Sequence, residues 1–300
     1  MANMFDFSHI DNSKMVIRKT WNEFRDCLAS KQFRYDEINA ALGIKFLRVF
    51  DDLFSHGHCF LEKKLVDVLG DNISIVRAAR IKDGDPLPTY ERFIPNAKYI
   101  RVSNRFSPPG TEWLYLAVAP LSDSENLSLD ENCALKECRA TAGEHFALCK
   151  FRRTDFNKDG QLVDLTIAKE AEYDDINQQL EEAGRHLANQ EASRIITALS
   201  STGVWQQPNT EGIISAVTKW AVYTYARLLS DEIFLPITTE DKDLMYAPFQ
   251  CLAQYFMSKG YCGIVYSSTV FPMGKNVVLF NKEAAAPYGD IKKIVIPEDF

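Results

Sequence analysis

Apolar residues recur at helical spacing in the first part of the chain. Between residues 36 and 54 they lie three or four positions apart, which is typical of one face of an amphipathic helix. The residues in this pattern are Ile38, Leu42, Phe46, Val49, Phe50 and Leu53. A further helix is predicted over residues 60–69, because Gly70 follows it as a plausible C-cap. Residues 13–70 are therefore expected to be mainly helical.

Short apolar runs separated by turn residues replace this pattern after residue 72. Such runs favour β-strands. The predicted strands are residues 74–81, 113–119, 146–151, 161–165, 263–267 and 276–280. One of the separating turns is the segment Ser-Pro-Pro-Gly at residues 107–110, in which proline restricts φ and glycine relaxes it.

Helical spacing returns between the fourth and fifth of these strands. Helices are predicted over residues 170–200, 213–234 and 249–259. The aromatic residues Trp220, Tyr223 and Tyr225 fit a packed core better than a stacking platform. The order helices, strands, helices, strands indicates an α+β fold rather than a doubly wound parallel sheet.

The same order predicts two domains. Residues 1–71 would form an N-terminal helical module, for which a regulatory or oligomerising role stays open. Residues 72–300 would form the main body, with a helical insertion at about 168–235.

Composition narrows the class of protein. Of the 300 residues, 46% are hydrophobic and 25% are charged, which is typical of a soluble globular protein. The net charge of −7 argues against a broad basic face for nucleic acid. No run approaches the roughly 18 apolar residues of a membrane helix, and the N-terminus does not resemble a signal peptide. Seven cysteines without disulfide or zinc spacing favour a reducing cytoplasm and no metal.

Two blocks of the sequence resemble the RES family, which is called after its Arg, Glu and Ser. The first block fits the pattern R-F-x-P-x-G from Arg105, then L-Y-L-A around Tyr115, then A-L-x-E ending at Glu137. The second fits Y-x-x-x-Q from Tyr246, then GIVYSS and GKNVVLF within residues 260–280. The match covers roughly residues 73 to 282. The resemblance implies an ADP-ribosyltransferase-like fold and an NAD-consuming enzyme.

The family resemblance also suggests roles for three residues. Glu137 would be the catalytic carboxylate, Arg105 would hold a phosphate or ribose of NAD, and Tyr115 would stack on or frame the nicotinamide. These residue types suit the chemistry, because breaking the nicotinamide–ribose bond develops positive charge on the sugar, which a carboxylate stabilises. A planar guanidinium suits a diphosphate, and a tyrosine offers a flat apolar face.

The resemblance also implies further NAD-binding residues. Ser268 would be the family serine, with Ser267 as the competing choice, and Arg77 and Arg80 would be phosphate ligands. Many members are toxins of toxin–antitoxin pairs, so the expected biology is a bacterial toxin or defence effector with a cognate antitoxin. Self-association is a further expectation.

Several alternatives stay open at this point. The acceptor of the ADP-ribosyl group would be water, phosphate or a protein, and a catalytically inactive nucleotide-binding module is the third reading. Arg105 and Glu137 could instead form a buried ion pair, with Tyr115 as plain core. Glu137 lies 22 positions after Tyr115, a longer separation than in the family pattern, so the polar loop at residues 122–130 would have to bulge outward.

Two other motif-like patterns are discounted. Asp155, Asn157 and Asp159 imitate a calcium-binding loop, but Thr166 stands where the bidentate Glu is needed, so a hairpin turn over residues 158–160 is predicted. Arg139 and His145 have the spacing of certain ribonuclease motifs, but a Gly-containing segment rather than a long helix separates them.

Overall fold

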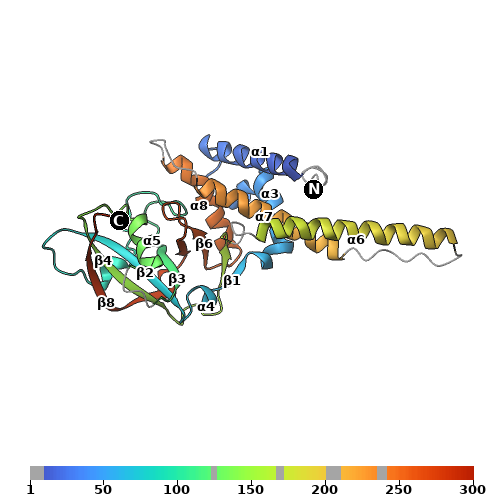
Figure 1. The fold of residues 1–300 in the computed structure, drawn as a ribbon. Coiled ribbons are helices and arrows are strands. Elements are labelled where there is room, and N and C mark those ends of the chain that lie inside the picture. The colour runs from blue at the N-terminus through green and yellow to red at the C-terminus, as the bar shows by residue number, and fades with distance from the viewer. Residues whose placement is uncertain (1–9, 123–126, 167–171, 201–210, 235–241) are drawn as a thin grey trace.

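An eight-stranded sheet is the centre of the described part of the chain (Figure 1). The computed structural model describes residues 10–122, 127–166, 172–200, 211–234 and 242–300. The strands are β1 (Glu62–Lys64), β2 (Ile73–Ile81), β3 (Leu114–Pro120), β4 (His145–Arg153), β5 (Gln161–Asp164), β6 (Gly263–Ser267), β7 (Lys275–Leu279) and β8 (Ala285–Val295). Their order is β1-β5-β6-β7-β3-β2-β4-β8, and only β5 and β6 run parallel. The protein is therefore α+β with a mainly antiparallel sheet, which confirms the predicted class.

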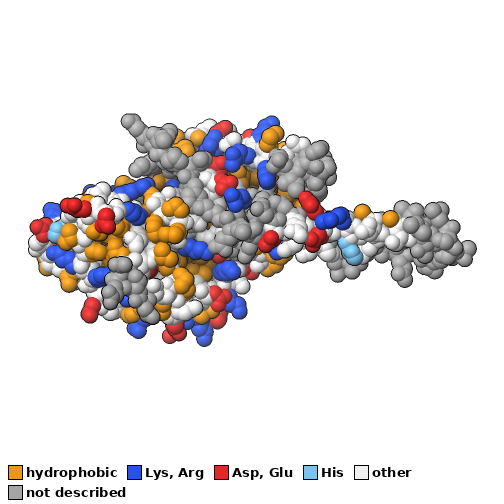
Figure 2. Space-filling model, in the orientation of Figure 1, with side chains coloured by type: hydrophobic (Ala, Val, Ile, Leu, Met, Phe, Trp, Pro, Cys, Tyr) orange, Lys and Arg blue, Asp and Glu red, His pale blue; other side chains and the backbone are white. Residues whose placement is uncertain are grey.

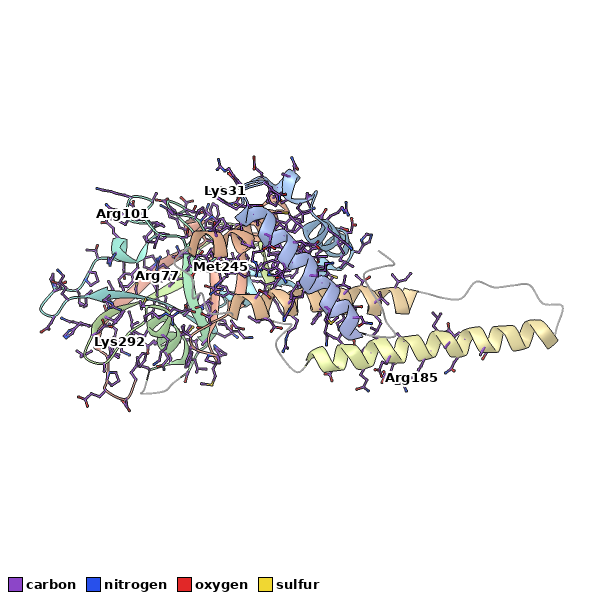
Figure 3. All side chains as sticks on the ribbon, turned by 90° about the horizontal axis from the view of Figure 1, so that it is seen from above. Lys31, Arg77, Arg101, Arg185, Met245 and Lys292 are labelled. Atoms are coloured by element: carbon purple, nitrogen blue, oxygen red, sulfur yellow. The ribbon has the colours of Figure 1, made fainter. Side chains whose placement is uncertain are left out.

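Helices from both ends of the chain form a second layer beside the sheet. The helices are α1 (Ile10–Ala29), α2 (Ile38–Ala41), α3 (Lys45–Gly57), α4 (Leu65–Val68), α5 (Leu129–Glu137), α6 (Glu172–Ser200), α7 (Glu211–Phe234) and α8 (Lys242–Ser258). Helix α1 packs on α3 and α8, and α3 packs on α7. Helix α6 pairs with α7 and extends away from the rest of the molecule (Figures 1 and 3).

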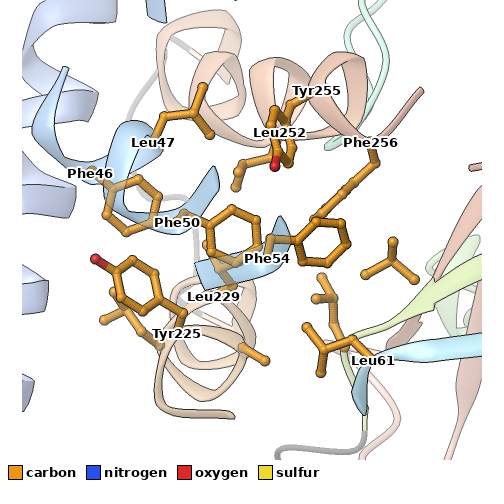
Figure 4. Packing of buried hydrophobic residues seen from close by; sticks show 14 of the residues in the cluster. Phe46, Leu47, Phe50, Phe54, Leu61, Tyr225, Leu229, Leu252, Tyr255 and Phe256 are labelled. Atoms are coloured by element: carbon orange, nitrogen blue, oxygen red, sulfur yellow. The ribbon is translucent and has the colours of Figure 1, made fainter. Parts of the chain in front are cut away.

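Aromatic rings fill the core of the helical layer (Figure 4). Phe50 has no exposed surface, and its ring contacts those of Phe54, Tyr225, Tyr255 and Phe256 at centroid distances of 5.3, 5.6, 5.8 and 6.0 Å. These rings come from α3, α7 and α8. The aromatic residues of the segment at 213–234 are buried as predicted: Trp220, Tyr223 and Tyr225 are at most 6% exposed.

Two predicted helices in the N-terminal region differ from the structure. The single helix over residues 36–54 is divided into α2 and α3, with a turn around Gly43. The helix over residues 60–69 is wrong, because Glu62–Lys64 pairs with β5 as an edge strand and only Leu65–Val68 is helical. Pairing with a distant strand overrides the local pattern here, while Leu65 and Leu69 still face the core.

Two features of the sheet also differ from the sequence-based expectations. The prediction of a hairpin turn over residues 158–160 is wrong, because the strands on either side of it, β4 and β5, do not pair with each other. Strand β4 pairs with β2 and β8, and β5 pairs with β1 and β6. Strand β8 was not predicted. Most of its residues are at least partly exposed, so its sequence lacks the apolar run that marks the other strands.

Neither a one-sign charged patch on the visible face (Figure 2) nor a disulfide is found among the described residues. Figure 2 shows basic and acidic side chains interspersed over the visible face. All seven cysteines are free thiols. Among the described residues, no helix combines the length and apolarity needed to cross a membrane.

The shared aromatic core generates a stability prediction. Phe50→Ala should lower the free energy of unfolding by about 3–5 kcal/mol, because it removes a fully buried ring and leaves a cavity. Urea unfolding followed by circular dichroism measures this change. Phe156→Ala is the control, since Phe156 is 41% exposed, and it should change the free energy by less than about 0.5 kcal/mol. Equal losses in the two variants would contradict the described core.

Candidate functional site

A cavity of about 430 Å³ lies where two neighbouring strands separate. Strands β2 and β3 pair only from Ile73↔Pro120 to Val76↔Ala117. Beyond Val76, β2 continues beside β4, while the other end of β3 continues beside β7. The cavity occupies this opening, and its volume is in the range of small-molecule sites. The polar or aromatic side chains among its lining residues are Arg77, Ser103, Asn104, Arg105, Tyr115, Glu137, Cys138, Arg139, Tyr246, Tyr266, Thr269 and Asn276.

Helix α5 brings Glu137 to the cavity at its last residue. The helix begins with a capping interaction, in which the Ser128 backbone N–H donates to Glu131 Oε2 at 3.1 Å. Glu131 is also ion-paired to Lys292 of β8 at 3.2 Å. The helix packs on β2, β3 and β7, so its C-terminal end lies over the opening. Glu137 therefore reaches the cavity that Tyr115 lines, despite the long connection between them.

A buried asparagine orients the Glu137 carboxylate. Asn276 lies on β7 and is 4% exposed. Its Nδ2 donates a hydrogen bond of 2.7 Å to Glu137 Oε1, and its Oδ1 accepts one of 3.4 Å from Cys133 Sγ. Within the described residues Glu137 Oε2 accepts no hydrogen bond, so this oxygen remains available to a ligand.

The Arg105 guanidinium is held by rings rather than by hydrogen bonds. Its central carbon lies 5.5 Å from the centre of the Tyr246 ring and 5.6 Å from that of Phe249. Burial lowers the pKa of Arg105, while Tyr246, Tyr266 and Glu137 oppose that shift. No hydrogen bond or ion pair engages the guanidinium within the described residues, so its donors are available. The alternative left open by the sequence, a buried ion pair between Arg105 and Glu137, is therefore not formed among the described residues.

The backbone around Arg105 is fixed by α8. Gln250 is 3% exposed, and its Nε2 donates to the Asn104 carbonyl at 3.2 Å. On the other side, the predicted Ser-Pro-Pro-Gly turn is present, with Gly110 at φ 80° and its N–H donating to the Ile100 carbonyl. The loop that presents Arg105 is thus held at both ends.

Tyrosine side chains form one wall of the cavity. Tyr115 of β3 is half-buried, and its hydroxyl lies 2.9 Å from Ser107 Oγ. Burial raises the pKa of Tyr115, and burial followed by the nearby Glu137 charge raises that of Tyr266. Both hydroxyls therefore stay neutral near pH 7. Together with Tyr246 they supply the aromatic surface of the cavity that Glu137 also lines.

The structure separates the two additional arginines named from the sequence. Arg77 lines the cavity, and its Nη1 donates to the Phe93 carbonyl at 2.6 Å. Arg80 does not line it. Arg80 is ion-paired with Glu144 and donates to the Cys138 carbonyl at 3.2 Å.

The two serines named from the sequence also lie outside the lining. Ser268 is fully buried, and its Oγ accepts hydrogen bonds from the backbone N–H groups of Val270 and Phe271 at 3.2 and 3.0 Å. Ser267 is 8% exposed at the end of β6. The structure thus brings together Arg77, Arg105, Tyr115 and Glu137, and it leaves both serines in a supporting position.

Eight polar or aromatic lining residues received no role from the sequence: Ser103, Asn104, Cys138, Arg139, Tyr246, Tyr266, Thr269 and Asn276. Asn276 had a signal, because it is a polar residue at the start of an otherwise apolar strand, where burial demands a partner. Arg139 had no such signal in the sequence, because its place in the cavity depends on where α5 ends in the folded chain.

The charge of the cavity is opposite to that of the chain. Arg77, Arg105 and Arg139 face one carboxylate, Glu137, which gives the lining two net positive charges in a chain of net charge −7. Such a lining attracts an anion. The tyrosine rings offer a second surface, against which a planar uncharged or cationic group can pack.

Comparisons with protein-family models, with curated proteins and with solved structures gave no match. What the chain does must therefore be inferred from the cavity itself.

Close packing beneath α5 leaves no room for a side chain at Gly274. A Cβ on Gly274 would lie 2.4 Å from Cys133 Sγ and 2.9 Å from Cys133 Cβ. Gly274 does not have a positive φ, so the requirement for glycine here is one of space. A side chain at this position would push α5 away from the strand that carries Asn276.

This contact predicts a double-mutant effect. Gly274→Ala should destabilise the fold by about 1–3 kcal/mol, because the added methyl overpacks the interface. Three atoms would clash with the added methyl: Cys133 Sγ, Cys133 Cβ and Phe271 Cδ1. Cys133→Ala removes the nearest of them, so the double variant should lose less than the sum of the single variants. Urea unfolding measures all three free energies. Gly184→Ala in α6 meets nothing within 4 Å and should be neutral or stabilising, and a similar loss there would refute the close packing.

Proposed function

We propose that the protein cleaves the nicotinamide–ribose bond of NAD and transfers the ADP-ribosyl group to water or phosphate. Three features support the proposal. A carboxylate, a tyrosine wall and available guanidinium donors converge on one cavity. The oriented Glu137 carboxylate, with Asn276 bonded to one of its oxygens, is the observation that carries it.

In this proposal Glu137 acts on the ribose. As nicotinamide leaves, the sugar acquires oxocarbenium character, which a nearby carboxylate stabilises more than it stabilises the ground state. Because Asn276 occupies Oε1, the Oε2 atom would face the sugar or accept a hydrogen bond from its 2′-hydroxyl. Preorganisation of this kind avoids reorientation of the carboxylate during the reaction.

The remaining cavity residues would hold the two ends of the dinucleotide. Arg105 and Arg77 would bind the diphosphate, because a guanidinium pairs with phosphate oxygens in a bidentate way. Tyr115, with Tyr246 and Tyr266, would frame the nicotinamide ring. Neutral tyrosines suit a leaving group that departs as an uncharged base. Ser268 would act indirectly, by fixing the turn after β6.

The proposal extends to the fold family of the protein and to its biological role. The mainly antiparallel sheet is compatible with an ADP-ribosyltransferase-like fold, and the paired sequence blocks favour it. Depletion of NAD would stop growth, so a toxin or defence effector, controlled by an antitoxin, is the proposed biological role.

One observation favours a second candidate, transfer of ADP-ribose to a protein. Tyr99 and Val102 are 69% and 72% exposed, immediately before the segment 103–105 that lines the cavity. Exposed apolar side chains beside a site can contact an acceptor protein.

The proposal predicts nicotinamide release from NAD by the purified protein. Glu137→Gln should lower the rate by at least ~100-fold, because it removes the electrostatic stabilisation of the transition state. Separation of nicotinamide by chromatography gives the rate, and a rate that rises with inorganic phosphate would identify phosphate as acceptor.

The matched control is Glu91→Gln, an exposed carboxylate outside the cavity, which should keep the wild-type rate. Absence of release from well-folded protein, with and without phosphate and added lysate, would contradict NAD cleavage and leave a binding module.

A separate prediction concerns the role of Asn276. Asn276→Ala should lower kcat by about tenfold or more with little change in KM for NAD, because it releases the carboxylate without touching the substrate. Steady-state kinetics on folded variants measures both constants. Asn96→Ala, an exposed asparagine outside the cavity, is the control. A raised KM at constant kcat would show that Asn276 binds substrate instead.

Labelled NAD in whole lysate separates the two candidate functions. Hydrolysis or phosphorolysis should leave the label in small molecules, and a Tyr99→Ala/Val102→Ala variant should keep its rate, because neither residue lines the cavity. Label on a protein band in the wild type, lost in this variant, would establish transfer to an acceptor.

A further inference from the structure

Helix α5 ends in a conformation that normally requires glycine. The Ala140 N–H donates to the Leu135 carbonyl at 3.1 Å, and the Arg139 N–H donates to the Lys136 carbonyl at 2.9 Å. These two bonds define a Schellman motif, and Ala140 and Leu135 share the apolar cluster beneath the helix. The left-handed residue of this motif is usually glycine, but here it is Arg139, with φ 55°. A side chain at such a position costs stability.

Contacts of the Arg139 side chain with the described residues do not offset this loss of stability. It is exposed and lines the cavity, and no hydrogen bond or ion pair engages its guanidinium there. Its neighbour Arg80 donates to the backbone carbonyl of Arg139, not to the side chain. A structural role in the folded chain therefore does not explain an arginine at this position.

Arg139 lies beside two other guanidinium groups in the lining of the cavity. The Arg139 charge is close enough to Arg105 to contribute to lowering the pKa of that guanidinium. Arg77 adds a third positive charge to the lining, and Glu137 is the single opposing carboxylate among the lining residues. Two or more guanidinium groups that repel one another across a cavity become mutually favourable when a dianion lies between them.

We propose that Arg139 is a ligand-binding residue that clamps a diphosphate or similar dianion together with Arg105. The left-handed backbone conformation directs the arginine into the cavity at the expense of stability, as is common for strained residues at functional sites. Assignment of that dianion to the diphosphate of NAD rests on the proposed function, whereas binding of the anion itself does not.

A simpler alternative is that Arg139 only complements the partial negative charge at the end of α5. The two readings differ in sign for one variant. Arg139→Gly relieves the left-handed strain, so it should raise the melting temperature by about 2–4 °C if the arginine serves binding. If the arginine serves the helix, the same change should lower the melting temperature and leave ligand binding intact.

The experiment measures anion binding and thermal stability in parallel, without turnover. Inorganic pyrophosphate and ADP-ribose are titrated calorimetrically into the full chain as wild type, R139G, R139N and R139K. R139G and R139N should weaken binding of both probes by about tenfold or more, because one charge-assisted contact is lost. R139K should bind between these values, since it keeps the charge and loses the fork. R139N is the second variant because asparagine also tolerates the left-handed region.

The matched control is R101A, an exposed arginine outside the cavity (Figure 3), which should bind like wild type. Wild-type affinity in R139G and R139N, an equal loss in R101A, or a lower melting temperature of R139G would each overturn the proposal. Arg139-dependent binding of pyrophosphate without nicotinamide release would uphold the anion clamp and contradict only NAD cleavage.

Discussion

The contact between α5 and the sheet is the constraint on which the cavity depends. Gly274 leaves the space that Cys133 fills, and Cys133 in turn hydrogen-bonds the buried Asn276. Asn276 then reaches Glu137 at the helix end. This close approach therefore links the packing of α5 on the sheet to the position of the Glu137 carboxylate.

The helical layer and the cavity are joined through α8. Phe249 packs against Trp21 of α1 at 5.5 Å and also lies under the Arg105 guanidinium. Gln250, next in the chain, holds the backbone before Arg105. Because one helix contributes to both the aromatic core and the site, helices from the beginning of the chain support the loop that would bind substrate. A change in their packing would reach Arg105 through two side chains.

The sequence predicts the fold class and much of the site, for reasons that can be traced to individual residues. The sequence predicted the strands with apolar runs and the helices with strong periodicity, because the residues that these elements bury follow a regular spacing along the chain. Short edge strand β1 and exposed strand β8 were not, because pairing with distant strands decides them. Arg77, Arg105, Tyr115 and Glu137, which the sequence assigned to one site, line the same cavity, and their roles stay predictions. Arg80 and Ser268 were named as ligands but lie outside the lining. For Arg80 the reason is local, because it lies three positions from Arg77 on β2, and the alternation of a strand places the two side chains on opposite faces.

The projection of α6 from the rest of the molecule has a hydrodynamic consequence. Its 29 residues correspond to a rod of about 43 Å, comparable to the diameter of a small domain. A particle with such an arm experiences more friction than a sphere of the same 34.1 kDa mass. It therefore elutes early in gel filtration, at a volume where a larger compact protein is expected. Light scattering or sedimentation equilibrium, which do not depend on shape, is the appropriate basis for assigning its subunit number.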